Sequence, residues 1–208
     1  MKLLIPNIRA AVSMTVLMTL LTGLAYPLAM TGVGQMLFPA QASGSLIKKG
    51  GTVIGSARIG QANSDPRYLL GRPSAGNYDA ANSGGSNLGP SSRELIATVR
   101  DRVKVMHKLD GNMLPAVDRV TASGSGLDPH LSLAAALQQV GRIARLRGTE
   151  PRRVREILER YIEGAYMGVI GEPVVNVLLA NLALDEAFPL KERDTAGAAG
   201  AIRRNPND

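Results

Sequence analysis

The stretch Ala10–Met30, AAVSMTVLMTLLTGLAYPLAM, decides the architecture of this chain of 208 residues. It opens a run from residue 10 to residue 47 that contains no Asp, Glu, Lys or Arg. Because an α-helix rises about 1.5 Å per residue, the stretch can cross the roughly 30 Å hydrocarbon core of a bilayer. Its Ser and Thr hydroxyls are tolerated there because they can donate to carbonyls of the preceding turn. We therefore predict one transmembrane helix over residues 10–32.

Basic residues set the predicted orientation of this helix. Lys2 and Arg9 precede it, and the next Lys or Arg along the chain is Lys48. Since the flank of a span that is richer in Lys and Arg stays in the cytoplasm, we predict that residues 1–9 form a short cytoplasmic N-terminus. Residues 33–190 would then form an extracytoplasmic domain of a protein that crosses the inner membrane of the cell once.

Two other interpretations of the N-terminal stretch are weaker. Ala40-Gln41-Ala42 could end a cleaved signal peptide, and the chain would then be a secreted protein such as a hydrolase. However, the apolar segment is longer than the roughly 7–15 residues typical of a signal peptide, and this site lies well past its end. A buried helix of a soluble protein would need a large surrounding core, which the rest of the chain can hardly supply.

The rare residue types exclude several kinds of chemistry. The chain has no Cys and only two His, His107 and His130. Disulfides, thiol catalysis, iron–sulfur clusters and zinc sites built from Cys or several His are therefore excluded, and no metal site is predicted. The net charge of +7 would permit nucleic acid as a partner. A domain outside the cytoplasm without interleaved aromatic residues does not favour one.

The first part of the predicted outer domain is rich in turn residues. Residues 45–60 place two β-favouring runs around Gly50-Gly51, which predicts a hairpin. Residues 61–90 are crowded with Gly, Pro, Asn and Ser, and they are predicted to form a loop whose length suggests a role beyond connection. A helix is predicted from Ser91, where Ser91-x-x-Glu94 forms a capping box, to about Gly111.

The second part of the outer domain combines helices with one strand. Asp128 as N-cap, followed by Pro129, predicts a helix that ends near Arg147. A further helix is predicted over residues 149–164, and residues 174–184 are predicted to be a buried strand that passes into a helical turn. Residues 191–208 lack a core-forming pattern and are predicted to be a disordered tail. The predicted fold is therefore one N-terminal transmembrane helix followed by a single compact α+β domain.

Two short Gly/Ser runs are candidate functional motifs. Ser83-Gly84-Gly85-Ser86-Asn87 and Ser123-Gly124-Ser125-Gly126 resemble loops that cradle anions, because glycine-rich backbone exposes N–H groups. Neither ends in the Gly-Lys-Ser/Thr of a P-loop, so turn formation is the simpler explanation. Asp128, His130 and nearby serines could be combined into a hydrolytic triad, but the chain has no Gly-x-Ser-x-Gly elbow. We therefore predict no catalytic residue.

Arginines are concentrated between residues 142 and 160. Glu150, Glu156 and Glu159 are interleaved with them at spacings of three and four residues, which predicts mostly a solvated helix face with ion pairs. A few polar residues on the preceding helix could face a partner instead, namely Gln138, Gln139, Arg142 and Arg145. The arginines of this cluster are Arg142, Arg145, Arg147, Arg152, Arg153, Arg155 and Arg160.

Five blocks, taken in order, resemble one protein family. They are residues 71–75 (GRPSA), 83–90 (SGGSNLGP), 122–129 (ASGSGLDP), Gln138 with Arg142 and Arg147-Gly148, and 171–184 (GEPVVNVLLANLAL). With the N-terminal anchor, they resemble the C subunit of the Kdp-type potassium-transporting ATPase from about residue 5 to about residue 190. The departures are modest: Ala62-Asn63 stand where the family tends to have a Phe, and Leu69-Leu70 replace an aromatic residue.

The resemblance implies an accessory subunit of an ATP-driven potassium uptake complex. Its partners would be a channel-like potassium-translocating subunit and a P-type ATP-hydrolysing subunit. ATP is implied as well, because this subunit is described in the family as raising the nucleotide affinity of the hydrolysing partner, and its Ser-Gly-Gly-Ser loop is likened to a nucleotide signature. The predicted topology places residues 48–208 on the side without ATP, so any such effect would be indirect.

We expect the loops 71–90 and 121–130 to dock on the potassium-entry face of the complex and to stabilise the assembly, because they are long and carry many backbone-permissive residues. The alternative is a nucleotide-binding regulator that faces the cytoplasm and uses the Gly/Ser loop at 83–88. The candidate residues for contact with a partner or a nucleotide are Arg72, Ser74, Ser83, Gly84, Gly85, Ser86, Asn87, Ser123, Ser125, Asp128, His130, Gln138 and Arg142.

Overall fold

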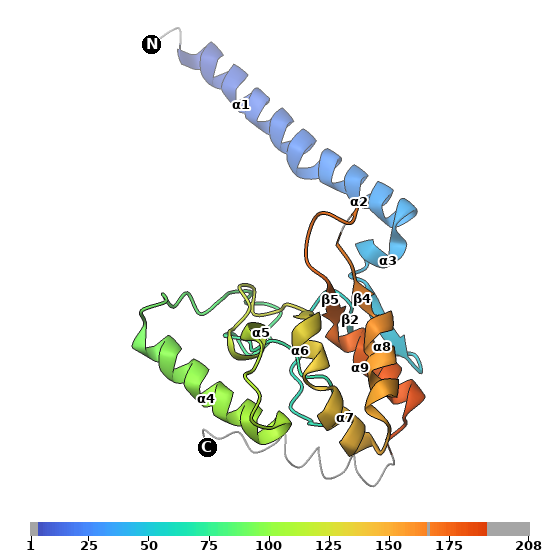
Figure 1. The fold of residues 1–208 in the computed structure, drawn as a ribbon. Coiled ribbons are helices and arrows are strands. Elements are labelled where there is room, and N and C mark those ends of the chain that lie inside the picture. Colours follow the sequence, from blue (N-terminus) through green and yellow to red (C-terminus); the bar gives the residue numbers. More distant parts are fainter. Residues whose placement is uncertain (1–3, 166, 191–208) are drawn as a thin grey trace. The chain divides into compact units, whose positions relative to one another are not determined.

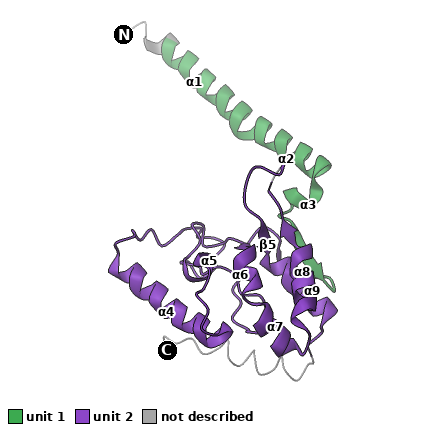
Figure 2. Ribbon diagram, in the orientation of Figure 1, with its two compact units in different colours: residues 1–54 green, residues 55–208 purple. Residues whose placement is uncertain are grey.

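The computed structural model describes residues 4–165 and 167–190, and the predicted tail over residues 191–208 lies outside them. The chain divides into two units, residues 1–54 and residues 55–208, which Figure 2 shows in different colours. Unit 1 contains the predicted span, and unit 2 contains every candidate site residue.

Unit 1 is dominated by one long apolar helix (Figure 1). It consists of α1 (Leu4–Leu20), the π-helical turn η1 (Leu21–Ala25) and α2 (Tyr26–Leu37). Among the described residues, Asn7–Leu37 is the one helix long and apolar enough to cross a membrane, with a mean hydropathy of 1.6. The prediction of a single N-terminal span is confirmed as far as length and composition go, and the helix extends beyond the predicted 10–32.

Two hydroxyls of this helix are satisfied within the helix itself. The hydroxyls of Thr22 and Thr31 donate to the carbonyls of Met18 and Pro27, at 2.7 and 2.8 Å. Such bonds satisfy a hydroxyl without water, which the interior of a bilayer requires. The π-helical turn lies just before Pro27, and a proline, which cannot donate a backbone hydrogen bond, is a common place for a helix to depart from regular geometry.

After the long helix, the chain forms the short α3 (Pro39–Ala42) and a hairpin of β1 (Leu46–Lys49) and β2 (Thr52–Ser56). The turn between the strands consists of Gly50 and Gly51, whose φ angles are 59° and 84°. A tight hairpin turn needs such left-handed residues, and glycine adopts this conformation without strain. The predicted hairpin is thus confirmed.

The long helix of unit 2 is α4 (Arg93–Asp110), which ends at Gly111 as predicted. Its N-cap is Ser92, whose hydroxyl accepts from the Leu95 N–H at 3.4 Å, so the predicted cap at Ser91 is wrong by one residue. Adjacent serines offer the same capping chemistry, and the local pattern therefore does not choose between them. The single-turn helix α5 (Val117–Val120) follows.

The predicted helix from Asp128 to Arg147 is wrong in its first part. His130–Ser132 form strand β3, and α6 (Leu133–Leu137) and α7 (Val140–Arg147) follow it. Pairing of β3 with the distant strand β5 (Val174–Asn176) outweighs the helix-start signal of Asp128-Pro129. The N-cap of α6 is Ser132, which accepts from the Ala135 N–H at 3.2 Å.

The C-terminal part of unit 2 completes a small antiparallel sheet. Helix α8 (Pro151–Arg160), strand β4 (Ile162–Glu163), β5 and helix α9 (Val177–Ala187) follow one another. The strand order is β3-β5-β4. Asn176 ends β5 and caps α9 by accepting from the Leu179 N–H at 3.2 Å. The strand that passes into a helix over residues 174–184 is thus confirmed.

The core of unit 2 is formed by its sheet together with α6, α7, α8 and α9. Leu131 of β3 and Val175 of β5 are 1% and 0% exposed. They belong to one cluster with buried residues of the helices and of the loop before α4, namely Leu69, Ile143, Val154, Leu158 and Leu184. Figure 1 shows these helices grouped beside the short strands. The α+β class of the domain is confirmed.

Candidate functional site

Residues 71–90 and 121–130, which the sequence singles out, lie against each other in unit 2, and we call them the interlocked loops. Arg72 Nη1 donates to Asp128 Oδ2 at 3.0 Å, which joins the two loops by an ion pair. Each of the two side chains is 27% exposed, so the pair lies near the surface. A partly solvated pair of this kind adds little stability, about 1 kcal/mol or less, but it fixes the two loops relative to each other.

Main-chain hydrogen bonds also hold the interlocked loops together. The Gly84 N–H donates to Ser125 O at 2.8 Å, and the Ser83 hydroxyl donates to the same oxygen at 3.1 Å. The Ser123 N–H donates to Pro73 O at 3.1 Å. A phosphate cradle needs N–H and O–H groups that point at the ligand, but these donors of Ser83 and Gly84 already have a protein acceptor. These two donors are therefore not available to a phosphate.

Glycines permit the close approach of the two loops. Gly126 has a φ of 69°, and a Cβ placed there would lie 2.8 Å from Gly84 O and 3.2 Å from Ser74 Oγ. A Cβ at Gly85 would lie 3.0 Å from Gly124 O. The backbone of one loop thus occupies the space that side chains would need on the other. Contact between the loops explains these glycines without any ligand.

Tyr78 stabilises the first of the interlocked loops by hydrogen bonds to other residues of the same loop. Its hydroxyl donates to Arg72 O, and its N–H donates to Ser74 Oγ at 2.9 Å. Burial raises the pKa of the Tyr78 hydroxyl above its ordinary value, so the hydroxyl remains a donor at physiological pH. The main chain of Arg72 is therefore fixed where its side chain reaches Asp128.

A groove of about 520 Å³ opens beside the Arg72–Asp128 pair. His130 lines it, with Nδ1 3.6 Å from Asp128 Oδ1 and Nε2 3.4 Å from Glu163 Oε2. The exposed Val117 forms part of its wall, so charged and apolar groups share one open surface. Among residues 4–165 and 167–190, no three His, Cys, Asp or Glu are grouped so that they could hold a metal ion.

The candidate residues differ in their access to solvent. Gln138 is partly buried and uses its side-chain amide to accept from the Ala116 N–H at 2.9 Å and to donate to Leu114 O at 3.0 Å. The exposed candidates are Ser83, Gly84, Ser86, Asn87 and Ser125. The other partly buried candidates are Arg72, Ser74, Gly85, Asp128 and His130, and the buried ones are Ser123 and Arg142.

Buried amides hold residues 65–70, which we call the strap and which lead into the interlocked loops. Gln139 accepts from the Leu70 N–H at 2.9 Å and donates to Leu70 O at 3.0 Å. Asn181 makes the same two bonds with Leu69, at 2.7 and 2.9 Å. Each amide thus makes the two hydrogen bonds that a neighbouring β-strand would otherwise make, and it satisfies the N–H and the carbonyl of one strap residue. Gln139, which the sequence suggested as a partner contact, is fully buried.

Sequence reasoning missed this use of Asn181 and Gln139 in positioning the site. A signal was present, because Asn181 interrupts the apolar run of residues 177–184 (VLLANLAL). A buried amide is costly unless it finds hydrogen-bond partners, so an Asn in such a run indicates a specific polar contact. The run does not identify the hydrogen-bond partner of Asn181, because that partner, Leu69, is far away in the sequence.

Arg142 and Arg147 lie in the interior of unit 2 rather than on its surface. Arg142 is 3% exposed, its Nε donates to Asp110 Oδ1 at 2.8 Å, and its Nη1 donates to carbonyl oxygens of the strap. The side chain of Arg147 is 0% exposed and pairs with Asp185 at 2.9 Å. The prediction of a solvated face is therefore wrong for Arg147, because the strap and α9 cover it.

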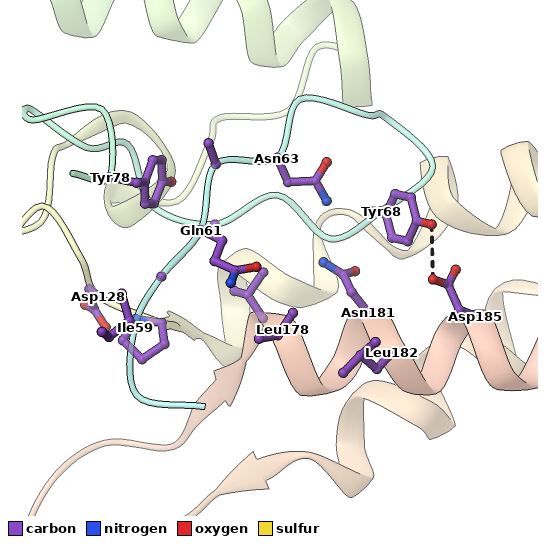
Figure 3. A pocket seen from close by; sticks show the side chains of 15 residues that line it. Ile59, Gln61, Asn63, Tyr68, Tyr78, Asp128, Leu178, Asn181, Leu182 and Asp185 are labelled. Atoms are coloured by element: carbon purple, nitrogen blue, oxygen red, sulfur yellow. Dashed lines mark hydrogen bonds between the residues drawn. The ribbon is translucent and has the colours of Figure 1, made fainter. Parts of the chain in front are cut away.

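A small cavity of about 170 Å³ lies between α9 and the chain that follows β2 (Figure 3). Gln61, Leu178 and Asn181 surround it, together with the Tyr68 hydroxyl, which donates to Asp185 Oδ2 at 3.1 Å. Burial and the nearby Asp185 carboxylate raise the pKa of Tyr68, so this donor also stays protonated. Pockets for drug-sized ligands usually measure roughly 300–1,000 Å³, and this cavity is too small for a nucleotide.

Comparison with known proteins identifies the family. The sequence matches the family described as "K+-transporting ATPase, c chain" over residues 8–186. The "Potassium-transporting ATPase KdpC subunit" of Methylococcus capsulatus is 51% identical over 187 residues, which cover 88% of this chain and 98% of that protein. The KdpC subunit of Rhodospirillum rubrum is 51% identical over 189 residues, with 88% and 97% covered. That of Bradyrhizobium diazoefficiens is 48% identical over 195 residues, with 87% and 97% covered.

The matched region includes the apolar helix from residue 8, both interlocked loops and α9 almost to its end. The resemblance expected from the five sequence blocks is thus confirmed. This chain belongs to the KdpC family, the c chains of K+-transporting ATPases.

Proposed function

We propose that this chain is a non-catalytic accessory subunit of an ATP-driven potassium uptake complex, in which the interlocked loops dock on a partner and stabilise the assembly. Membership of the KdpC family supports a role within a multi-subunit K+-transporting ATPase. The observation that carries the docking role is the bonding of the two loops to each other, which prepares a polar surface in the isolated chain. The proposed partners are the potassium-translocating subunit and the ATP-hydrolysing subunit.

A prepared surface favours docking because little conformational freedom is lost when a partner binds. A segment as long as 71–90 would otherwise lose roughly 1–2 kcal/mol per residue on becoming ordered. Here the Arg72–Asp128 pair and the main-chain bonds order it in advance, and the buried amides hold the strap before it. The exposed Ser86 and Asn87 are then presented on an ordered support.

We further propose that the domain docks outside the cytoplasm, on the face where potassium enters. Arg9 lies at the N-terminal end of the candidate span Asn7–Leu37, and residues 38–47 after the span carry no charge, so the positive-inside rule favours a cytoplasmic N-terminus. Fusions of a compartment-specific reporter after residue 40 and after residue 190 test this placement. Cytoplasmic signals at both positions would overturn it and would favour a regulator that meets nucleotide directly.

Direct contact with ATP is disfavoured by the geometry of the Gly/Ser run. The donors of Ser83 and Gly84 are bound to Ser125 O, so these two groups are not available to a phosphate. An effect on the nucleotide affinity of the hydrolysing subunit would then be an indirect coupling. Such coupling requires that this chain contact two states of its partner with different affinity.

Alanine substitution of Arg72, Asn87 and Asp128, one at a time, tests the docking surface. We expect each variant to lower co-purification of the partner subunits and potassium uptake by about tenfold, the effect of losing about 1.4 kcal/mol at an interface. The double exchange R72D/D128R should restore part of the loss, because it rebuilds the ion pair that joins the loops.

The control for this experiment is Arg152→Ala. Arg152 also forms an ion pair, with Glu156 at 3.0 Å, but its side chain is 85% exposed on α8 and lies outside the interlocked loops. It should leave assembly and uptake unchanged. Melting curves of all variants separate misfolding from lost docking. Unchanged assembly and uptake in all three test variants would refute the proposed docking surface.

A further inference from the structure

The connection between β4 and β5 exposes a cluster of large apolar side chains. Residues 164–171, GAYMGVIG, contain no charged residue, and we call them the apolar turn. Met167, Val169 and Ile170 are 81%, 84% and 67% exposed. In Figure 1 this connection leaves the body of unit 2 as a long loop. Single exposed apolar residues are ordinary, whereas three on one short turn indicate a surface that is covered in the working protein.

The apolar turn is not a misplaced part of the core of unit 2. The strands that carry it are short, and they pair through Ile162 with Val175 and through Glu163 with Val174. Val175 is fully buried in the core cluster, so the sheet uses its own residues to pack against the helices. The turn lies beyond the last of these pairs, and none of its described residues, 164, 165 and 167–171, belongs to that cluster. Its apolar side chains can therefore be buried in an apolar environment outside unit 2.

We propose that the apolar turn inserts into the interfacial layer of the lipid bilayer and gives this chain a second membrane contact besides its spanning helix. Met, Val and Ile side chains are suited to this layer because they lose contact with water when they enter it. The proposal does not depend on the docking role of the interlocked loops, nor on which side of the membrane holds unit 2.

The spanning helix supplies a reason why lipid is the occupant. The candidate span ends at Leu37, and unit 2 begins at Gly55. At roughly 3.4 Å per residue, the intervening residues 38–54 reach at most about 60 Å even when fully extended. Unit 2 is thus tethered within that distance of the end of the span, and a tether of this length raises the effective concentration of the bilayer surface to about millimolar. A short apolar turn, too weak to bind membranes alone, can remain inserted under this condition.

The charges around the apolar turn define the kind of lipid contact. Glu163 and Glu172 flank it, and both are exposed. Carboxylates at the membrane surface are repelled by anionic headgroups, so the attraction must come from apolar insertion and not from charge. We therefore expect insertion into a zwitterionic phosphatidylcholine bilayer, with no gain when anionic phosphatidylglycerol is added. A basic surface patch would show the opposite dependence.

A second exposed apolar segment, residues 111–117, differs from the apolar turn in its surroundings. Leu114 is 85% exposed and Val117 is 73% exposed. Gln138 bonds the backbone of this segment to the rest of unit 2, and Val117 lines the groove beside Arg72. This segment therefore borders the proposed docking surface, and Leu114 provides a matched control of equal exposure.

Site-specific fluorescence on the complete chain tests the inference, and the natural absence of Cys makes single-cysteine labelling clean. The variants V169C and L114C, each labelled with an environment-sensitive dye, are reconstituted in phosphatidylcholine nanodiscs that contain spin-labelled lipid. We expect the dye at 169 to shift its emission to the blue and to be quenched by the lipid label. The dye at 114 should show neither effect.

The same labelled chains, assembled with their partner subunits, distinguish lipid from protein as the occupant. Quenching by lipid at 169 should persist in the complex. If the dye at 169 is not quenched by lipid, or if it is shielded from an aqueous quencher only when partner subunits are added, the inference is overturned. The second of these outcomes would make the turn a protein contact instead.

A charged variant provides an independent readout. V169D/I170D places two carboxylates on exposed positions, so folding should be retained, as a melting curve will show. A dye at Met167→Cys should lose its lipid quenching in this background, whereas L114D should leave that quenching intact. Co-purification of partner subunits reports on the interlocked loops, so failure of the lipid contact and failure of the docking role give different results. Unchanged quenching at position 167 in the V169D/I170D chain would overturn the inference.

Discussion

Asp110 is the residue whose removal most directly tests how the interior of unit 2 is held together. It is the last residue of α4, and its side chain is 4% exposed. One carboxylate oxygen pairs with Arg119 and the other accepts from Arg142 Nε at 2.8 Å. The two arginine side chains are 3% and 1% exposed. Asp110→Ala would therefore leave two buried guanidinium groups without their shared carboxylate.

The expected loss is large because a buried charge without a partner is unstable. Breaking a buried ion pair by removing one member costs about 3–5 kcal/mol. In a domain of this size, each 1 kcal/mol shifts the melting temperature by about 2–4 °C. We therefore expect the melting temperature of unit 2 to fall by about 6–20 °C. Remaining bonds of Arg142 to the strap carbonyls place the result toward the lower end.

The assay is thermal unfolding of the complete chain in detergent, followed by near-UV circular dichroism of its tyrosines, since the chain has no Trp. Asp101→Ala is the matched control. Asp101 lies on the same helix and pairs with Lys104 at 2.8 Å, but the two side chains are 72% and 64% exposed. Its loss should leave the melting temperature unchanged, because solvent screens such a pair.

Equal shifts for the two aspartate variants would refute the reasoning, since burial is the feature that separates them. A further variant examines the cause of the loss. In D110L/R119M/R142M the buried charges are replaced together by apolar side chains, which should restore part of the stability, although the strap carbonyls that accept from Arg142 lose their donor. If this triple variant remained as unstable as Asp110→Ala, lost packing and not unpaired charge would explain the effect.

Two further predictions concern the loops of unit 2. Gly126→Ala should lower the free energy of unfolding, measured by urea titration, by about 1–3 kcal/mol, because its φ of 69° is strained for alanine and the new Cβ would meet Gly84 O. Gly124→Ala is the control: its Cβ would have open space, so the same titration should show little change. Burial alone would raise the pKa of Asp65, but hydrogen bonds and charge from Arg67 outweigh it and lower that pKa. The stabilisation by Asp65 should therefore be complete above the ordinary carboxyl pKa of about 3.9 and should disappear as the pH falls through the lowered folded-state pKa. In acid titrations, the difference in free energy of unfolding between the natural chain and Asp65→Asn should narrow as the pH falls below about 3.9. A difference that stays constant with pH would contradict the assignment.

Features with a local cause were predicted well from the sequence. The apolar run predicted the long helix of unit 1, and Gly50-Gly51 predicted the turn of the hairpin. Pro151 begins α8 as expected, and Gly148, with a φ of 62°, ends α7. In each case a few neighbouring residues determine the backbone conformation, so no knowledge of the fold was needed.

Features that depend on distant partners were predicted poorly. Asp128-Pro129 has the local chemistry of a helix start, yet the next residues form β3 because a strand more than forty residues later pairs with them. The arginine cluster shows the same limit. Arg152 pairs with Glu156 on its own helix, as the spacing predicts, whereas Arg147 finds its partner Asp185 on α9. Spacing along one helix identifies neighbours on that helix and says nothing of carboxylates that the fold brings from elsewhere.

The interlocked loops show why a glycine-rich motif alone does not determine its own function. The same residue types that let a backbone surround a phosphate also let two backbones approach each other, because both need exposed N–H groups and the absence of a Cβ. Here the Gly84 N–H and the Ser83 hydroxyl bind Ser125 O, and Gly126 leaves room for Gly84 O. The donors are thus used within the chain. Their effect is to order a polar surface beside the Arg72–Asp128 pair, which is the surface that we propose for docking.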